Sequence, residues 1–275
     1  MKKKGCAFLN FFRYFPKLFA AGLMFSVPFA VFTAILALIG YLTGFNNIIL
    51  WGLSVIPASP MLAGLAMTVR KIAIENTDVE LIPTFREVVK ENFKAFLLHG
   101  VVIYLICACT FFSVLYYGSM AAVNAMYAST LTMYMLFTAV LVVVMFYVPI
   151  MTVTYELRLR DIYKNAFLLV IGKILRNLIA LVFITLLSAV AFFGIVLTNG
   201  VWLWITVALI VALYPMMFVY ISISVISKGM QESVGSFVNP VKAEVDDSKA
   251  VAEAVSSAEG SDYVFVNGKM IKVEK

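Results

Sequence analysis

Charged residues are scarce in this sequence, and their positions exclude an ordinary soluble fold. Only 13% of the 275 residues are Asp, Glu, Lys or Arg, whereas 63% are hydrophobic. Within residues 18–227, every charged residue lies in one of two clusters, 70–94 and 156–176. The apolar runs between them are long enough to cross a hydrocarbon core of about 30 Å as helices. This pattern is typical of an integral membrane protein.

The sequence also lacks the residue patterns of several enzymes and carriers. It contains no Walker A glycine loop, no His-Glu-x-x-His and no Gly-x-Ser-x-Gly. No acid or base lies in the middle of an apolar run, which argues against a proton relay. The single histidine, His99, lies near the charged end of its run and is expected at headgroup level. We therefore expect no enzymatic activity, no catalytic residue and no cofactor.

Cysteine is rare as well, and its placement predicts neither disulfides nor a metal site. Cys6 lies beside the membrane, whereas Cys107 and Cys109 lie inside the third apolar run, where we interpret them as small packing residues. The sequence has no basic stripe with interleaved aromatic residues, so we expect no nucleic-acid partner.

The apolar runs predict an all-α, polytopic membrane protein with six transmembrane helices. We place the helices at residues 18–42, 48–69, 95–117, 126–153, 178–197 and 201–226. The pattern argues against barrel strands, because the runs are continuously apolar over about twenty residues, whereas barrel strands alternate over about ten. The helices form three hairpins, which close at uncharged connections.

The distribution of Lys and Arg predicts the orientation. Residues 1–228 hold 16 Lys and Arg against 7 Asp and Glu, and none of these lies in the three connections 43–47, 118–124 and 199–200. Short loops rich in Lys and Arg stay in the cytoplasm, so both charged clusters and both termini are predicted to be cytoplasmic. There, anionic lipid headgroups favour each nearby cation by about 1 kcal/mol.

Each hairpin is preceded by a segment typical of an interfacial amphipathic helix. Residues 8–17 are aromatic with two cations, residues 83–96 begin with a Thr84–Glu87 capping box, and residues 159–172 have one apolar face. Polar side chains in and beside these segments are candidates for partner docking or headgroup contact. They are Arg13, Lys17, Arg70, Lys71, Arg86, Lys90, Asn92, Arg160, Lys164 and Asn165.

The three segments share the pattern Arg-x-x-x-Lys, with the arginines 73 and 74 positions apart. We interpret this as an internal repeat of three units. The second helix of each hairpin contains a proline, at Pro60, Pro149 and Pro215, with Pro57 in addition in the first unit. These prolines are candidate helix kinks, which serve either packing or a pivot beside a polar cavity.

The composition changes after the last apolar run. Residues 1–228 form the membrane domain, and residues 229–262 are predicted to be a flexible acidic linker because they have little to bury. Residues 263–275 predict a β-hairpin, which turns at Asn267–Gly268. Such a hairpin either docks on another surface, including the strand edge of a cytoplasmic partner, or frays.

Three stretches carry a resemblance to a known family. They are the run from Pro57 to Arg70-Lys71, Asp78 with the helix Phe85-Arg86-Glu87-Val-Val-Lys90-Glu91-Asn92-Phe93-Lys94, and Leu159-Arg-Asp-Ile-Tyr-Lys-Asn-Ala-Phe167. With them the chain resembles the YesL-like family of bacterial membrane proteins, whose function is unknown, over roughly residues 10–225. The resemblance implies a multi-pass protein of the bacterial cytoplasmic membrane that is associated with carbohydrate ABC transport.

These observations leave two functional hypotheses of different classes. The first is a non-enzymatic accessory or regulatory protein with a cytoplasmic docking surface for a partner, such as a carbohydrate ABC transporter component. The alternative is a permease or channel-like subunit that moves a small solute. The Glu-Ala-Ala-x-x-x-Gly signature with which ABC permeases contact their ATPase is not found. A lipid-interacting scaffold is a third reading.

Overall fold

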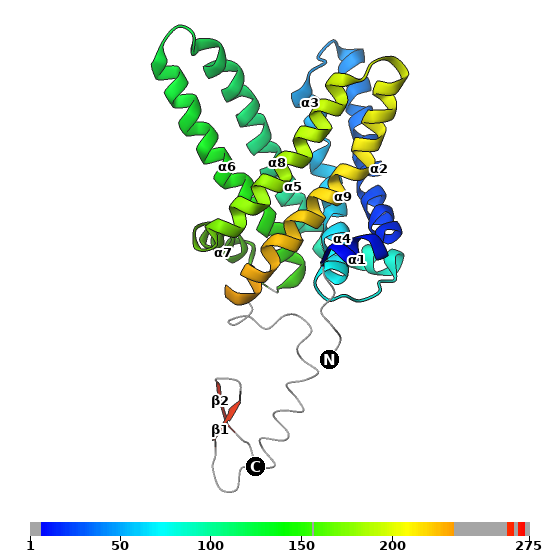
Figure 1. Cartoon of the computed structure of the whole chain (residues 1–275), viewed down its shortest axis with the longest axis vertical. Coiled ribbons are helices and arrows are strands. Elements are labelled where there is room, and N and C mark those ends of the chain that lie inside the picture. Colours follow the sequence, from blue (N-terminus) through cyan, green and yellow to red (C-terminus); the bar gives the residue numbers. More distant parts are fainter. Residues whose placement is uncertain (1–6, 156, 234–262, 267–268, 273–275) are drawn as a thin grey trace.

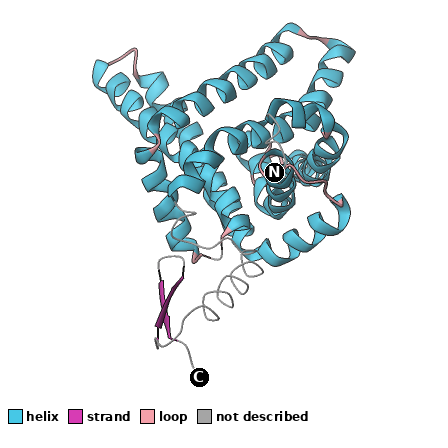
Figure 2. Ribbon diagram, turned by 60° about the horizontal axis from the view of Figure 1, so that its bottom comes forward, coloured by secondary structure: helices cyan, strands magenta, loops and turns pink. Residues whose placement is uncertain are grey.

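The computed structural model describes residues 7–155, 157–233, 263–266 and 269–272. Almost all of this part of the chain is helical (Figure 2). The helices, in chain order, are α1 (Ala7–Arg13), α2 (Phe15–Thr43), α3 (Ile48–Gly52), α4 (Val55–Ala73), α5 (Leu81–Met120), α6 (Ala125–Thr154), α7 (Leu159–Gly172), α8 (Ile174–Leu197) and α9 (Gly200–Ser233).

The structure confirms an all-α membrane protein with six apolar spans. Within the described residues, six segments are long and apolar enough to cross a membrane: α2, α3 with α4, α5, α6, α8 and the α9 portion Gly200–Ser227. Many large apolar side chains on these helices face outwards; Leu105 is 53% exposed and Leu186 57%. A soluble monomer rarely exposes so extended an apolar surface, so this surface indicates a lipid-facing bundle.

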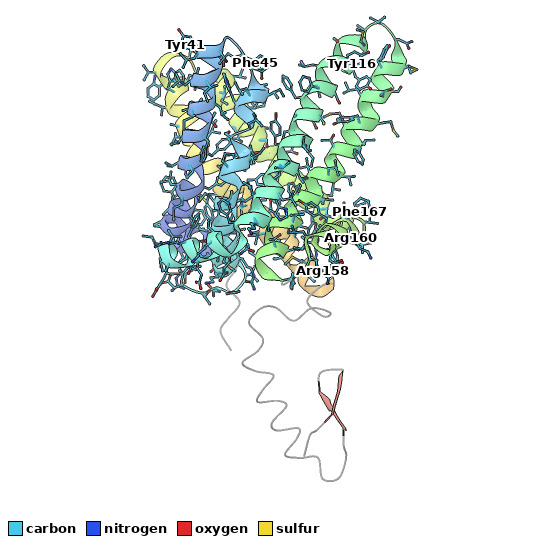
Figure 3. The ribbon with its side chains drawn as sticks, turned by 180° about the vertical axis from the view of Figure 1, so that it is seen from behind. Tyr41, Phe45, Tyr116, Arg158, Arg160 and Phe167 are labelled. Atoms are coloured by element: carbon cyan, nitrogen blue, oxygen red, sulfur yellow. The ribbon has the colours of Figure 1, made fainter. Side chains whose placement is uncertain are left out.

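The two ends of the bundle differ in charge. Tyr41, Phe45 and Tyr116 lie at one end, which holds the three uncharged turns, whereas Arg158 and Arg160 lie towards the other (Figure 3). We call the first the neutral end. The other, which carries α1, residues 74–80 and α7, we call the charged end. In Figure 1 the α5–α6 hairpin leans away from α2 and α9 towards the neutral end, whereas the helices converge towards the charged end.

The structure differs from the prediction in the second unit. The expected surface helix and the third span form one continuous helix, α5, because the stretch from Thr84 to His99 contains no glycine or proline. In the first unit α1 ends at Arg13, and Pro16, which has no backbone N–H, lies in the first turn of α2. In the third, α7 ends at Gly172 and α8 begins at Ile174.

The second span is interrupted near its start. α3 ends at Gly52 and α4 begins at Val55. Pro57 has no N–H to donate to the carbonyl oxygen of Leu53, which accepts instead from the N–H of Ile56 at 3.1 Å. Pro57 therefore lies in the first turn of α4, where a proline is tolerated, whereas Pro60 lies inside that helix.

Helix α4 supplies much of the core. Leu65, Ala66 and Val69 on this helix are fully buried. Gly64 allows α5 to come close, because the ring of buried Phe85 packs directly against it; a Cβ atom at Gly64 would lie 2.5 Å from that ring. Small residues allow helices to approach closely in membranes, where packing drives association.

The boundary predicted after residue 228 is too early. Helix α9 continues to Ser233, and Met230 is only 1% exposed. Residues 234–262 of the predicted linker lie outside the described residues. Strands β1 (Tyr263–Val266) and β2 (Lys269–Lys272) pair antiparallel, with Val266 opposite Lys269. Its turn, residues 267–268, and its end, 273–275, are likewise outside the described part.

Candidate functional site

A polar cavity of about 610 Å³ opens at the charged end, between α4, α5 and the segment that joins α6 to α7. Its size falls within the range of about 300–1,000 Å³ that is usual for ligand pockets. The polar side chains that line it are Arg70, Lys71, Glu75, Thr84, Glu87, Glu91, Asn92, Thr152, Thr154 and Tyr155. All of its charged side chains come from the first charged cluster, whereas residues after 156 contribute only Leu157, Leu159 and Ile162.

A buried histidine lies behind the cavity wall. His99 on α5 is fully buried, and its Nδ1 lies 2.7 Å from the Tyr163 hydroxyl on α7. Its Nε2 lies 3.0 Å from Oγ1 of Thr152 on α6, a residue that lines the cavity. The position of His99 in the sequence suggested a side chain at headgroup level. In the structure the side chain is instead enclosed by protein. It joins three helices that hydropathy alone cannot place side by side.

The hydrogen bonds around His99 define which nitrogen carries a proton in the neutral ring. The Thr152 hydroxyl donates its single hydrogen to the carbonyl oxygen of Val148 at 2.8 Å, so it accepts from Nε2–H of His99. Nδ1 then accepts from the Tyr163 hydroxyl. Burial raises the pKa of Tyr163 to about 12, so this hydroxyl remains a donor at neutral pH.

The charged groups of the cavity are unequally paired. Arg70 forms an ion pair with Glu75 at 3.0 Å. Glu87 and Glu91 are exposed on α5, one helical turn apart, and neither forms an ion pair within the described part of the chain. With Lys71, the lining holds two cations against three carboxylates. Besides the Arg70–Glu75 pair, the cavity therefore presents two carboxylates and one cation, Lys71, to an incoming group.

The lining of the cavity includes a buried hydroxyl. Thr154, in the last position of α6, is 5% exposed, and its Oγ1 has no hydrogen-bond partner among the residues that the structure describes. The next residue, Tyr155, is 4% exposed, and burial raises its pKa. Since buried hydroxyls normally find a partner, the Thr154 hydroxyl marks a place where a bound group would complete the hydrogen bonding.

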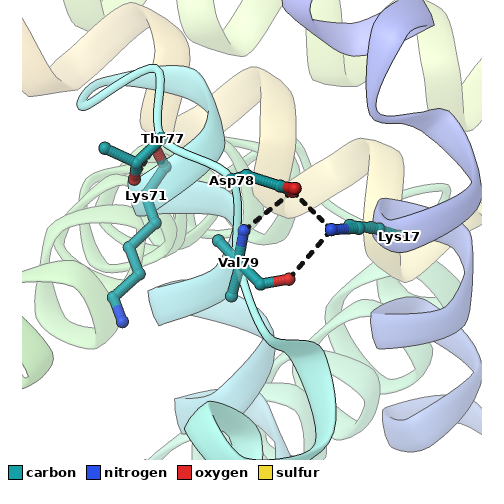
Figure 4. A network of polar contacts seen from close by, with 5 residues as sticks. All are labelled: Lys17, Lys71, Thr77, Asp78 and Val79. Carbon is teal, nitrogen blue, oxygen red and sulfur yellow. Dashed lines mark hydrogen bonds and ion pairs between the residues drawn. The ribbon is translucent and has the colours of Figure 1, made fainter.

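Lys17 takes part in a separate polar contact at the charged end (Figure 4). It forms an ion pair with Asp78 and donates to the carbonyl oxygen of Val79 at 3.1 Å. The hydrogen bond from Lys17, followed by that from the backbone N–H of Val79, holds the pKa of Asp78 below its usual value. This contact fixes the 74–80 connection to the start of α2. Arg13 stacks on the ring of Tyr14, 5.3 Å from its centroid.

The structure brings only some of the predicted site residues together. Arg70, Lys71 and Asn92 line the polar cavity, and Asn92 donates to the Val88 carbonyl at 3.1 Å. The others do not line it: Arg13, Lys17, Arg86, Lys90, Arg160, Lys164 and Asn165. Arg86 and Lys90 face a groove on the opposite side of α5, and Arg160 and Lys164 are exposed on α7.

Pro149 lines a second cavity, of about 260 Å³, deeper in the bundle. This cavity lies between α4, α5, α6 and α9, and its lining is almost entirely apolar. Its Ser222 hydroxyl is already bonded to the Phe218 carbonyl at 2.8 Å. Cys107 also lines it and is exposed, as is Cys109, so these thiols are less enclosed than predicted. Pro215 lies inside α9.

Sequence reasoning missed Glu87, Glu91 and Thr154 as cavity residues and His99 as a bridging side chain. The spacing of the two glutamates places them on one helical face, which was a usable signal. Nothing local indicates that His99 meets Tyr163, because the two residues are 64 positions apart.

Residues 39–114 match the family described as Protein of unknown function, DUF624. The matched segment runs from the end of α2 through most of α5. It therefore includes the α4 and α5 walls of the polar cavity and His99, but not α6 or α7. Comparison with curated proteins and with solved structures finds no match.

Proposed function

We propose that this chain is a non-enzymatic accessory protein of the membrane, which docks a partner protein through the polar cavity at its charged end. The observation that carries the proposal is the cavity's unpaired chemistry. Among the described residues, Glu87 and Glu91 have no ion-pair partner. The buried Thr154 hydroxyl has no hydrogen-bond partner among them either. A bound partner segment would supply what these groups lack.

The chemistry of the cavity favours a partner segment that carries a basic side chain. A Lys or Arg of that segment would meet Glu87 and Glu91 at the rim, where charge-assisted hydrogen bonds are the strongest available. A polar group further along the segment would pair with Thr154. A cavity of about 610 Å³ accommodates a few side chains, so a loop or helix end fits it better than a whole domain.

The resemblance to the YesL-like family suggests the identity of the partner. We infer that it is a component of a carbohydrate ABC transporter in a bacterial cell membrane, and that the charged end faces the cytoplasm. The excess of Lys and Arg at that end supports this orientation.

A permease or channel-like role is less well supported. A polar solute needs groups that replace its hydration, whereas the cavity within the span region is lined almost only by apolar side chains. Solute flux through the purified protein in liposomes separates the two roles. The docking proposal expects no flux above empty liposomes, and rapid saturable flux would favour a permease.

Crosslinking and copurification from the cells that make the protein test docking. The informative variant is Glu87→Gln/Glu91→Gln, and a matched control, Glu80→Gln/Asp161→Asn, removes two carboxylates outside the cavity. Transporter subunits should copurify with the wild type and with the control variant. The amount that copurifies with the cavity variant should be much lower. Absence of such subunits from the wild type, together with unchanged sugar uptake after deletion, would refute the proposal.

A further inference from the structure

A second surface feature lies on the opposite side of α5 from the polar cavity. It is an open groove of about 740 Å³ between α2 and the first turns of α5, with Met61 of α4 also in its lining. Its walls are apolar; Leu23 and Val27 come from α2, and Ile82 and Val89 come from α5. Val27 is 56% exposed and Ile82 70%, so the walls are open to whatever surrounds the bundle.

Two cations are the only charged side chains in this lining. Arg86 and Lys90 are both exposed and lie four residues apart, so they project from the same face of α5. Neither forms an ion pair within the described part of the chain. The nearby carboxylates Glu87 and Glu91 belong to the polar cavity instead. The helix thus separates its charges, with cations towards the groove and acids towards the cavity.

This arrangement defines the chemistry of the occupant. Like charges one helical turn apart repel each other, and a shared anion removes that repulsion. An exposed apolar groove on a membrane bundle is a surface for apolar matter, and acyl chains are what the surrounding lipid supplies. An occupant that satisfies both parts has an anionic head and an apolar chain. A zwitterionic head fits less well, because it brings a cation of its own towards Arg86 and Lys90.

We propose that this groove binds one anionic glycerophospholipid of the surrounding leaflet. Its phosphate lies between Arg86 and Lys90, and one acyl chain lies along Leu23, Val27 and Ile82. The bound lipid covers apolar walls that would otherwise contact mobile lipid, and it connects α2 to α5. This site is independent of partner docking, because its residues do not line the polar cavity.

Native mass spectrometry of the full-length protein in detergent measures the binding, with phosphatidylglycerol and phosphatidylcholine as probes. We expect the wild type to retain one phosphatidylglycerol in preference to phosphatidylcholine. Water-soluble glycerol phosphate should neither bind nor raise the unfolding temperature, because it lacks the chain that fills the groove. Equal retention of the two lipids, or equal binding of glycerol phosphate, would overturn the proposal.

Variants with matched controls assign the site. Arg86→Gln/Lys90→Gln should weaken phosphatidylglycerol binding about 30-fold at low salt, since each cation near a membrane surface contributes about fivefold. Arg160→Gln/Lys164→Gln removes cations with the same spacing from exposed positions of α7 and should change binding little. An equal loss in both variants would mean general surface attraction only.

A third variant tests the apolar part while the cations remain. Val27→Trp fills the groove at an exposed position and should displace the lipid although Arg86 and Lys90 are unchanged. Size-exclusion chromatography and thermal unfolding establish that each variant is folded before binding is compared. Wild-type retention of phosphatidylglycerol by folded Val27→Trp would show that the chain does not lie in this groove.

Discussion

The imidazole of His99 and the hydroxyl of Tyr163 lie 2.7 Å apart and join α5 to α7 beneath the polar cavity. Through Thr152 the same imidazole also contacts α6. The network holds α5 against α6 and α7, and residues of all three helices line the cavity. Tyr163 is thus a positioning residue for the proposed docking surface rather than a part of that surface.

Tyr163→Phe should destabilise the protein by about 1 kcal/mol, because it leaves the buried Nδ1 of His99 without its donor. Reversible unfolding in detergent measures the change. Phe167→Leu is the control, since Phe167 lies one turn further along α7 and is 47% exposed. Equal stability of Tyr163→Phe and the wild type would mean that the hydrogen bond does not hold α7 in place.

Gly64→Ala should destabilise the contact of α4 with α5 by about 1–3 kcal/mol, because the new methyl group overlaps the Phe85 ring. Gly118→Ala provides the comparison. Nothing lies within 4 Å of a Cβ at Gly118, which is also in a helix, so this variant should be neutral or more stable by up to about 1 kcal/mol. Thermal unfolding of both variants tests the packing. The reverse order of stabilities would contradict it.

Asp78→Asn should reduce stability at pH 7 and have progressively less effect as the pH falls. The folded-state pKa of Asp78 is lowered by Lys17, so its stabilisation is present above the unfolded value of about 3.9 and is lost as the pH drops through the lower folded value. The contact is exposed, so salt should shrink the effect as well. Unfolding temperatures from pH 3 to 7 measure it, with Glu80→Gln as the control. If the difference in unfolding temperature between the wild type and Asp78→Asn grew towards pH 3, the Asp78 pKa would not be lowered in the folded state.

Single cysteines in a background without Cys6, Cys107 and Cys109 test the topology. Phe45→Cys at the neutral end should react with an impermeant maleimide added to intact cells, whereas Arg160→Cys should react only after the cells are opened. Reaction of Arg160→Cys in intact cells would invert the orientation and remove the charged end as a cytoplasmic docking surface.

The six spans were predictable from the sequence because lipid strongly constrains where charged residues lie along the chain. Charges cannot lie inside the hydrocarbon core, so their two clusters mark where the chain leaves the membrane. The neutral turns were predictable for the same reason. The internal repeat stays a prediction, since shared Arg-x-x-x-Lys patterns do not establish equivalent packing.

The polar cavity was only partly predictable, because hydropathy says little about which side of a span faces protein. His99 looked peripheral in sequence and is fully buried, since α6 and α7 fold over it. Arg86 and Arg70 looked equivalent as cations, yet they line different features on opposite sides of α5. The rotation of a helix about its axis and the identity of the helix packed against it decide which of its side chains line a cavity. Both depend on contacts between residues distant in the chain.

A photocrosslinker placed at Asn92 in living cells tests most directly whether the polar cavity is the docking surface. The matched position is Met133, which is 70% exposed on α6 and does not line the cavity. Docking predicts a covalent adduct from position 92 to a transporter component, lost in the Glu87→Gln/Glu91→Gln background, and none from position 133. Adducts to lipid alone from position 92, or the same protein adducts from both positions, would contradict it.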